Sequence, residues 1–258
     1  MKISLSIADL PFNIKIEDLF SKAANLGFDG VEVLPGFKIS TIPQLSDLSK
    51  KYNVPILSIH HPFWVGKYII SSEKAFAMAK SFNAVIVVHP LKNQSLSSIK
   101  QNDFMDQIAK LSKETKVTVA VENMPIKSAL PIYKYFSKAH ESTAQLLPLY
   151  KLCKGYGFGL TLDTSHFKAQ DVLSVEGFDK IMPLIKNIHL SDCTKSKQHL
   201  ALGDGYIDLE KLLKHLKKVN YSGLLTLELS PRLYSNKEKY YRDIEKSFFL
   251  IRSCLGIK

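Results

Sequence analysis

The chain has 258 residues, of which 45% are hydrophobic and 23% charged, the size and composition of one large globular domain spanning residues 1–258. No stretch approaches the roughly 20 apolar residues of a membrane span, and the N-terminal residues lack the long apolar core and cleavage site of a signal peptide. We therefore expect no membrane association. Three widely spaced cysteines without a CxxC pair argue against a disulfide framework or a thiolate zinc site, and favour a reducing, cytoplasmic location.

The net charge of the chain is +11 at neutral pH. This excess favours anionic partners, either phosphorylated metabolites or nucleic acid. A lysine-rich surface without a specific partner is the alternative. The lysines are spread along the chain without a dense run, so charge alone does not identify a nucleic-acid-binding protein.

Strand-type and helix-type segments alternate along the whole chain. Strands are expected at Ile3–Ile7, Gly30–Leu34, Pro55–His60, Ala84–His89, Val117–Met124, Phe158–Asp163, Ile185–Ser191 and Gly223–Ser230. Helices are expected at Ile16–Leu26, Ile42–Lys51, Ser72–Ser81, Ser98–Lys113, Ser142–Lys154, Val172–Met182, Leu209–Val219 and Lys237–Cys254. Ser72 and Asp208 are the expected N-caps of their helices.

The alternation predicts an α/β fold with a parallel sheet, and eight units predict a single closed (β/α)8 TIM barrel. No Pro/Gly/Ser-rich linker divides the chain. The longest irregular stretch, from about Pro125 to Glu141, follows the fifth strand, and we expect it to form part of the rim of the active site.

Polar residues stand at the C-terminal ends of seven of these strands, where barrels of this kind carry their chemistry. By the alternation of side chains along each strand they face the barrel interior. They are Glu32, His60, His89, Glu122, Asp163, His189 and Glu228. Ser58, Thr161, Asn187 and Thr226 lie two positions before some of them and predict a polar layer beneath. A barrel built only for stability would have Val, Ile or Leu in these positions.

Four of these residues predict a metal site. In VTVAVENM, Glu122 points away from the valines, and an isolated buried carboxylate is costly unless a cation or water satisfies it. Asp163, His189 and Glu228 occur in similar positions. Carboxylates and neutral imidazoles suit a divalent ion of borderline hardness, such as Mn²⁺, Zn²⁺, Co²⁺ or Mg²⁺.

The remaining histidines are candidates for binding substrate or a second ion. Strand alternation sends His60 into the barrel and His61 to the loop. His89 ends a strand, His166 follows Asp163 by three positions, and His199 precedes a Gly-Asp-Gly turn. For each, a hydrogen-bonded loop or strand-end histidine is the alternative.

Side chains in the expected loops add two weaker candidates. Phe63 and Trp64 are either an apolar wall for a substrate or plain loop packing. Basic side chains on the same rim are either phosphate ligands or solvated surface charges. These are Lys67, Lys127, Lys195, Lys197 and Arg232.

Eight segments together resemble the xylose-isomerase-like barrel superfamily, which includes sugar isomerases, epimerases and the endonuclease IV type of abasic-site nuclease. In order, they are LGFDGVEV, SIHHPF, VVHP, VENM, LTLDTSHF, IHLSD, HLALGDGYIDL and LTLELSP. The resemblance implies one divalent ion held by Glu122, Asp163, His189 and Glu228. It also implies that Glu122 and Glu228 move protons on a sugar, polyol or sugar phosphate through an enediolate. Such barrels often pair, so a homo-oligomer is an open alternative.

The nuclease branch, AP endonuclease family 2, is the alternative, with abasic DNA as the substrate. It builds a trinuclear zinc site from nine residues, and this chain matches eight of them. They are His60, His89, Glu122, Asp163, His166, His189, His199 and Glu228. The ninth position, an Asp in that branch, is Lys197, which cannot ligate zinc while protonated. The glycine-rich opening segment of the nuclease is also missing, so we expect an isomerase or epimerase of carbohydrate metabolism.

Overall fold

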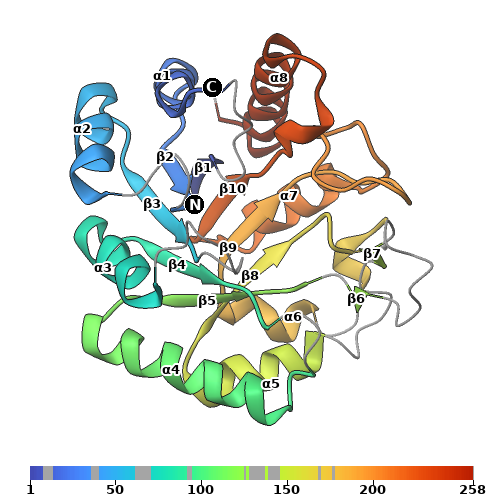
Figure 1. The fold of residues 1–258 in the computed structure, drawn as a ribbon. Coiled ribbons are helices and arrows are strands. Elements are labelled where there is room, and N and C mark those ends of the chain that lie inside the picture. The colour runs from blue at the N-terminus through green and yellow to red at the C-terminus, as the bar shows by residue number, and fades with distance from the viewer. Residues whose placement is uncertain are drawn as a thin grey trace.

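The computed structural model describes residues 1–7, 14–35, 41–61, 71–91, 95–124, 126–127, 137–138, 146–167, 170–175 and 178–257. Within them, eight parallel strands close into a barrel surrounded by helices, which confirms the predicted TIM barrel (Figure 1). The barrel strands are β1 (Lys2–Ser6), β2 (Gly30–Val33), β3 (Ile56–His60), β4 (Val85–Val88), β5 (Val119–Glu122), β8 (Gly159–Asp163), β9 (Ile185–Leu190) and β10 (Leu224–Leu227). Their order around the barrel is β1-β10-β9-β8-β5-β4-β3-β2, so the first and last strands pair.

The helices lie outside the barrel and cover its strands (Figure 1). They are α1 (Ile16–Leu26), α2 (Ile42–Tyr52), α3 (Ser72–Phe82), α4 (Ile99–Thr115), α5 (Leu146–Tyr156), α6 (Phe178–Ile181), α7 (Leu209–Lys218) and α8 (Lys237–Leu255). Short 3₁₀ turns occur at Val172–Ser174, Met182–Leu184 and Pro231–Leu233. None of the described helices is both long and apolar enough to cross a membrane.

Two local expectations were wrong. Ser71, not Ser72, caps α3, because its Oγ accepts from the backbone N–H of Lys74 at 3.4 Å. The sixth crossover is not one helix from Val172 to Met182 but a 3₁₀ turn, the short α6 and a second 3₁₀ turn that contains Pro183. Proline has no N–H to donate, which favours such a break. The other cap was right: Asp208 accepts from the N–H of Lys211 at 3.0 Å.

The long stretch after β5 is not wholly irregular. It contains an antiparallel pair of two-residue strands, β6 (Ile126–Lys127) and β7 (Ser137–Lys138), to one side of the barrel (Figure 1). Residues 128–136 and 139–145 lie outside the described residues, as do Phe63, Trp64 and Lys67.

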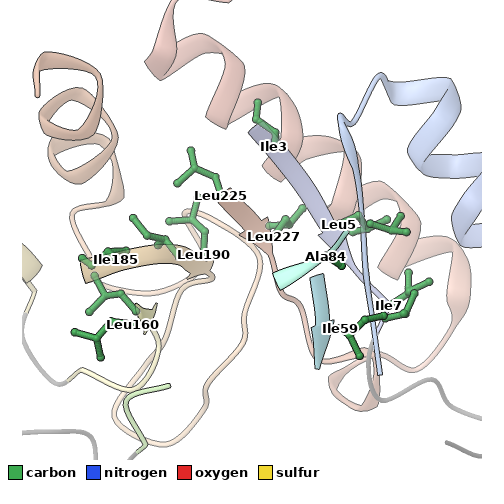
Figure 2. Packing of buried hydrophobic residues seen from close by; sticks show 14 of the residues in the cluster. Ile3, Leu5, Ile7, Ile59, Ala84, Leu160, Ile185, Leu190, Leu225 and Leu227 are labelled. Atoms are coloured by element: carbon green, nitrogen blue, oxygen red, sulfur yellow. The ribbon is translucent and has the colours of Figure 1, made fainter. Parts of the chain in front are cut away.

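The hydrophobic core occupies the layer between barrel and helices. Leu5 of β1 and Leu225 and Leu227 of β10 are fully buried there, beside Leu190 of β9 (Figure 2). Because side chains alternate along a strand, the residues between them face the barrel interior. Those inward residues are largely polar, so the barrel has an apolar outside and a polar inside at its C-terminal half.

Candidate metal centre

The structure brings the four predicted metal ligands to one place at the C-terminal mouth of the barrel. Glu122 ends β5, Asp163 ends β8, His189 is the fifth residue of β9, and Glu228 directly follows β10. One potential ligand atom from each lies within 4.8 Å of the others. Strand alternation produces this convergence, because each side chain is inward and each strand ends at the same rim.

Several atoms of this group are buried and lack a hydrogen-bond partner among the described residues. They are Oδ2 of Asp163, Nδ1 of His189, Oε2 of Glu228 and, nearby, Nδ1 of His199. Nδ1 of His189 lies 2.9 Å from Oε2 of Glu228 without the alignment of a hydrogen bond, and 3.5 Å from Oε2 of Glu122. Unsatisfied buried polar atoms are costly. A divalent ion among them would satisfy them, and nitrogen and carboxylate donors are the set that such ions take.

A second group of potential ligands adjoins the first through Glu122. Oε2 of Glu122 lies 2.9 Å from Nε2 of His89 and 3.5 Å from Nε2 of His60. These three residues also have ligand atoms within 4.8 Å of one another. The two predicted histidines therefore do face the site from β3 and from the end of β4.

A third group adjoins the first through Asp163. Oδ2 of Asp163 lies 3.4 Å from Nε2 of His166 and 3.9 Å from Nδ1 of His199. His199 reaches the site from the β9–α7 loop, with a left-handed backbone at φ 55°. The structure thus places all eight predicted carboxylate and imidazole groups in three contiguous groups.

Lys197 is placed differently. It lies in the same β9–α7 loop as His199 but is exposed, whereas the residues of the three groups are buried or partly buried. Its backbone forms a turn with Thr194: the N–H of Lys197 donates to Thr194 Oγ1 at 3.1 Å, and the N–H of Thr194 donates to the Lys197 carbonyl at 2.8 Å. A role for its side chain stays a prediction.

Two histidine rings are oriented by backbone carbonyls. Nδ1 of His60 lies 3.2 Å from the carbonyl oxygen of His61, and Nδ1 of His166 lies 2.7 Å from that of Asn123. A carbonyl oxygen only accepts, so each Nδ1 carries the proton. In both rings the remaining nitrogen, Nε2, then presents its lone pair to the carboxylates, which is the arrangement of metal-binding histidines.

Asn123 is a site residue that the sequence reasoning missed. It is buried, its Oδ1 accepts from the backbone N–H of Asp163 at 2.7 Å, and its Nδ2 donates to the Asp163 carbonyl at 3.1 Å. Asn123 therefore ties the ends of β5 and β8 together and orients His166. Its position directly after Glu122 in VENM was the available signal, since a polar amide at a strand end needs partners when buried.

Asp192 was missed as well. It is buried just after β9 and accepts four backbone N–H groups. Its Oδ1 accepts from Cys193 at 2.8 Å and Ile207 at 3.1 Å, and its Oδ2 accepts from Gly203 at 3.0 Å and Gly205 at 2.9 Å. A Cβ at Gly205 would collide with this carboxylate. The Asp192 carboxylate thus shapes the loop that carries His199.

The predicted polar layer beneath the site is present. Ser58, Thr161, Asn187 and Thr226 are all buried. Thr226 Oγ1 donates to Asn187 Oδ1 at 2.8 Å, and Asn187 Nδ2 donates to Glu32 Oε2 at 3.2 Å. Glu32, singled out in the sequence only as a polar strand-end residue, is fully buried at the centre of this layer.

The acidic groups differ in their affinity for protons. Burial alone would raise the pKa of Glu122, but His89 and His189 outweigh burial and hold this pKa well below its ordinary value. Burial is likewise outweighed at Glu228, where His189 and His199 lower the pKa to about 2. Both carboxylates are therefore ionised at neutral pH and available as bases or ligands.

Asp163 and His189 both have raised pKa values, for different reasons. Burial raises the pKa of Asp163 despite its neighbouring histidines. Burial would lower the pKa of His189, but the carboxylates of Glu32, Glu228 and Glu122 outweigh it and raise this pKa well above its ordinary value. Because both pKa values are raised, a divalent cation would have to compete with protons at these two residues.

The chain is similar in sequence to an uncharacterized protein of Mycobacterium tuberculosis, with 28% identity over 252 residues and 89% of each chain covered. It is also similar to fructoselysine 3-epimerase of Escherichia coli O157:H7, with 24% identity over 255 residues, 87% of this chain and 91% of that protein. The crystal structure of a D-tagatose 3-epimerase-like protein shares the fold with a TM-score of 0.68 and 20% identity, covering 97% and 98% of the two chains. A family model described as xylose isomerase-like TIM barrel matches residues 20–250. The chain therefore belongs to the xylose isomerase-like TIM barrel family.

Proposed function

We propose that the protein is a divalent-metal-dependent isomerase or epimerase of a small sugar, polyol or sugar phosphate. The observation that carries this proposal is the convergence of Glu122, Asp163, His189 and Glu228 within 4.8 Å, with unpartnered buried atoms facing one another. The names of the relatives, two of them epimerases or epimerase-like, support the same reaction class. Mn²⁺, Zn²⁺, Co²⁺ and Mg²⁺ all suit this donor set.

Glu122 and Glu228 are the proposed acid/base pair. Their carboxylates approach Nδ1 of His189, at 3.5 Å and 2.9 Å respectively, and both are ionised at neutral pH. One carboxylate removes a proton from the carbon beside the substrate carbonyl, which leaves an enediolate. The other takes a proton from water and delivers it to that carbon, and the first then gives its own proton to the hydroxide left behind. A bound divalent ion would supply the Lewis acidity that stabilises the developing negative charge.

The surrounding histidines are the proposed substrate contacts. His60, His89, His166 and His199 belong to the two outer groups of potential ligands and carry ring nitrogens that donate to or accept from hydroxyl groups. The polar layer beneath them closes the floor of the site. A substrate rich in hydroxyl groups, rather than an apolar one, fits this lining.

Deuterium exchange tests the proposal without requiring the product to be known. Ketoses and ketose phosphates are incubated in D₂O with protein loaded with each of the four metals, and NMR follows the proton on the carbon beside the carbonyl. We expect its replacement by deuterium for at least one class of sugar. Metal-loaded protein that exchanges no such proton in any sugar would contradict the proposed reaction.

Hydrolysis of abasic DNA is the second candidate function, and one observation favours it. The three contiguous groups share Glu122 and Asp163, as expected of a site for three ions. Against it, Lys197 replaces an acidic ligand and is exposed. Elemental analysis and an incision assay on an abasic-site duplex separate the two. About three zinc ions per chain together with incision would favour the nuclease. One or two ions per chain and no incision would favour the isomerase.

A further inference from the structure

Glu32 lies below the candidate metal centre and receives four hydrogen bonds. Its Oε1 accepts from Ser6 Oγ at 3.2 Å. Its Oε2 accepts from Ser58 Oγ at 2.7 Å, Asn187 Nδ2 at 3.2 Å and His189 Nε2 at 3.2 Å. The residue is fully buried, and His189 is also buried completely. No step of the proposed reaction uses Glu32, so its burial requires another explanation.

The contact between Glu32 and His189 crosses the barrel interior. Glu32 belongs to β2 and His189 to β9, and β1 and β10 lie between these strands in the barrel. The pairing of β2 with β3 shifts between Val31 and Glu32, which sets Glu32 opposite Ser58. Such irregularities re-aim side chains beside active sites. The local register thus directs the Glu32 carboxylate toward the ring of a residue 157 positions away.

This contact determines which nitrogen of His189 is available to a metal. A carboxylate oxygen only accepts, so Nε2 carries a proton, and Nδ1 is the nitrogen that faces Glu122 and Glu228. A metal ion that displaces any proton from Nδ1 would find its lone pair there. Backbone carbonyls fulfil the same role for His60 and His166. At His189 the acceptor is the side chain of Glu32, so a substitution can test whether the acceptor fixes the ring.

We propose that Glu32 is a positioning residue that fixes the orientation and tautomer of His189, so that Nδ1 and not Nε2 binds the divalent ion. The inference rests on the proposed function only in that His189 must be a metal ligand. Neither the substrate nor the reaction enters it. Partners of this kind also raise the basicity of a metal-binding histidine.

Zinc binding by the full-length protein tests the proposal. Glu32→Ala removes the acceptor, and we expect the dissociation constant for zinc to rise about 10- to 100-fold, the usual effect of losing such a partner. Glu32→Gln keeps a carbonyl oxygen that can accept from Nε2, and should recover part of the affinity. Ser6→Ala is the matched control, because it removes only the bond to Oε1, and it should bind zinc like the wild type. Wild-type affinity in Glu32→Ala would overturn the proposal.

The wild-type protein provides a test that does not depend on a variant folding. In zinc-loaded protein labelled with ¹⁵N-histidine, with His189→Gln used to assign the signal, we expect the His189 proton on Nε2 and zinc on Nδ1. A proton on Nδ1 would overturn the positioning role while leaving the metal centre intact. A wild-type protein that binds no zinc at all would remove both the metal centre and this proposal.

Discussion

Nε2 of His89 lies 2.9 Å from Oε2 of Glu122, although His89 follows β4, Glu122 ends β5, and the two are 33 positions apart. The same carboxylate approaches His60 and His189 at 3.5 Å each. Glu122 is therefore the residue through which two of the three groups of potential ligands meet.

The first prediction concerns the acid/base pair. Glu122→Gln and Glu228→Gln keep the side-chain volume but remove the base, so we expect each variant to fold and its kcat to fall about 10²- to 10⁴-fold. Glu210→Gln is the control, because Glu210 is an exposed residue of α7 paired with Lys214. Steady-state assays on the substrate found by deuterium exchange make the measurement. Full turnover by Glu228→Gln would reject its role.

The second prediction concerns removal of the metal. Chelation should lower the unfolding temperature, and adding back Mn²⁺, Zn²⁺ or Co²⁺ should restore it, because an ion that binds only the folded state stabilises it by about 2.7 kcal/mol at 100 times its dissociation constant. Calorimetry provides the measurement. Asp163→Asn should show little of this gain. His215→Gln should keep it, since His215 of α7 packs against Phe178 of α6 and lies outside the three groups.

The third prediction concerns Asn123. Asn123→Ala leaves the buried backbone N–H of Asp163 without its acceptor, which should cost about 1–3 kcal/mol of unfolding free energy. Because the same residue holds the ends of β5 and β8 together, metal affinity should also fall. Urea unfolding and metal titration measure the two effects. Ser81→Ala, an exposed helical position on α3, should stay within about 0.5 kcal/mol of the wild type.

The fourth prediction compares two aspartates in one loop. In Asp192→Asn an NH₂ group, which only donates, takes the place of a carboxylate oxygen that accepts two N–H groups, those of Gly203 and Gly205. We expect the unfolding free energy to fall by at least about 2 kcal/mol and hydrogen exchange at these two amides to become faster. Asp204→Asn removes only the exposed pair with Lys246 and should cost less than about 1 kcal/mol. Equal effects of the two substitutions would show that the Asp192 carboxylate does not organise the loop.

The fifth prediction concerns pH. Cys153 is a free, buried thiol, and burial raises its pKa to about 12 from an ordinary 9.0. Above pH 9.0 the unfolded chain releases this proton while the folded protein keeps it, so the folded state binds more protons and loses stability as the pH rises. Between about pH 9 and about pH 10 the Cys153 contribution should fall by about 1 kcal/mol, because the unfolded thiol is already half ionised at the lower pH. Urea unfolding of the wild type and of Cys153→Ala at both pH values isolates this contribution. If the unfolding free energy fell by the same amount in the two proteins, the prediction would be contradicted.

The sequence predicts the fold and the members of the site for the same reason. Strand alternation is a local property, and in a barrel all strands end at one rim, so the inward polar residues Glu122, Asp163 and His189 had to meet. His199 is a harder case, because its loop follows from four backbone amides gathered on Asp192, which no local pattern reveals.

The misses have a common physical origin. Asn123 satisfies backbone groups of a strand 40 positions away, and Glu32 reaches His189 through a shift in strand register. Neither the register nor such partners can be read from alternation, which gives only the face on which a side chain lies. Ser71 and Ser72 are both good caps, and only the backbone geometry decides between them.

The pairing of β1 with β10 has a consequence for synthesis on the ribosome. Lys2 pairs with Leu224 and Leu5 with Leu227, so the first strand made must wait for the last of the eight before the barrel closes. Glu228 follows that last strand. A nascent chain therefore carries Glu122, Asp163 and His189 for some time without Glu228, and tight binding of the proposed metal ion should begin only once β10 and Glu228 have been made.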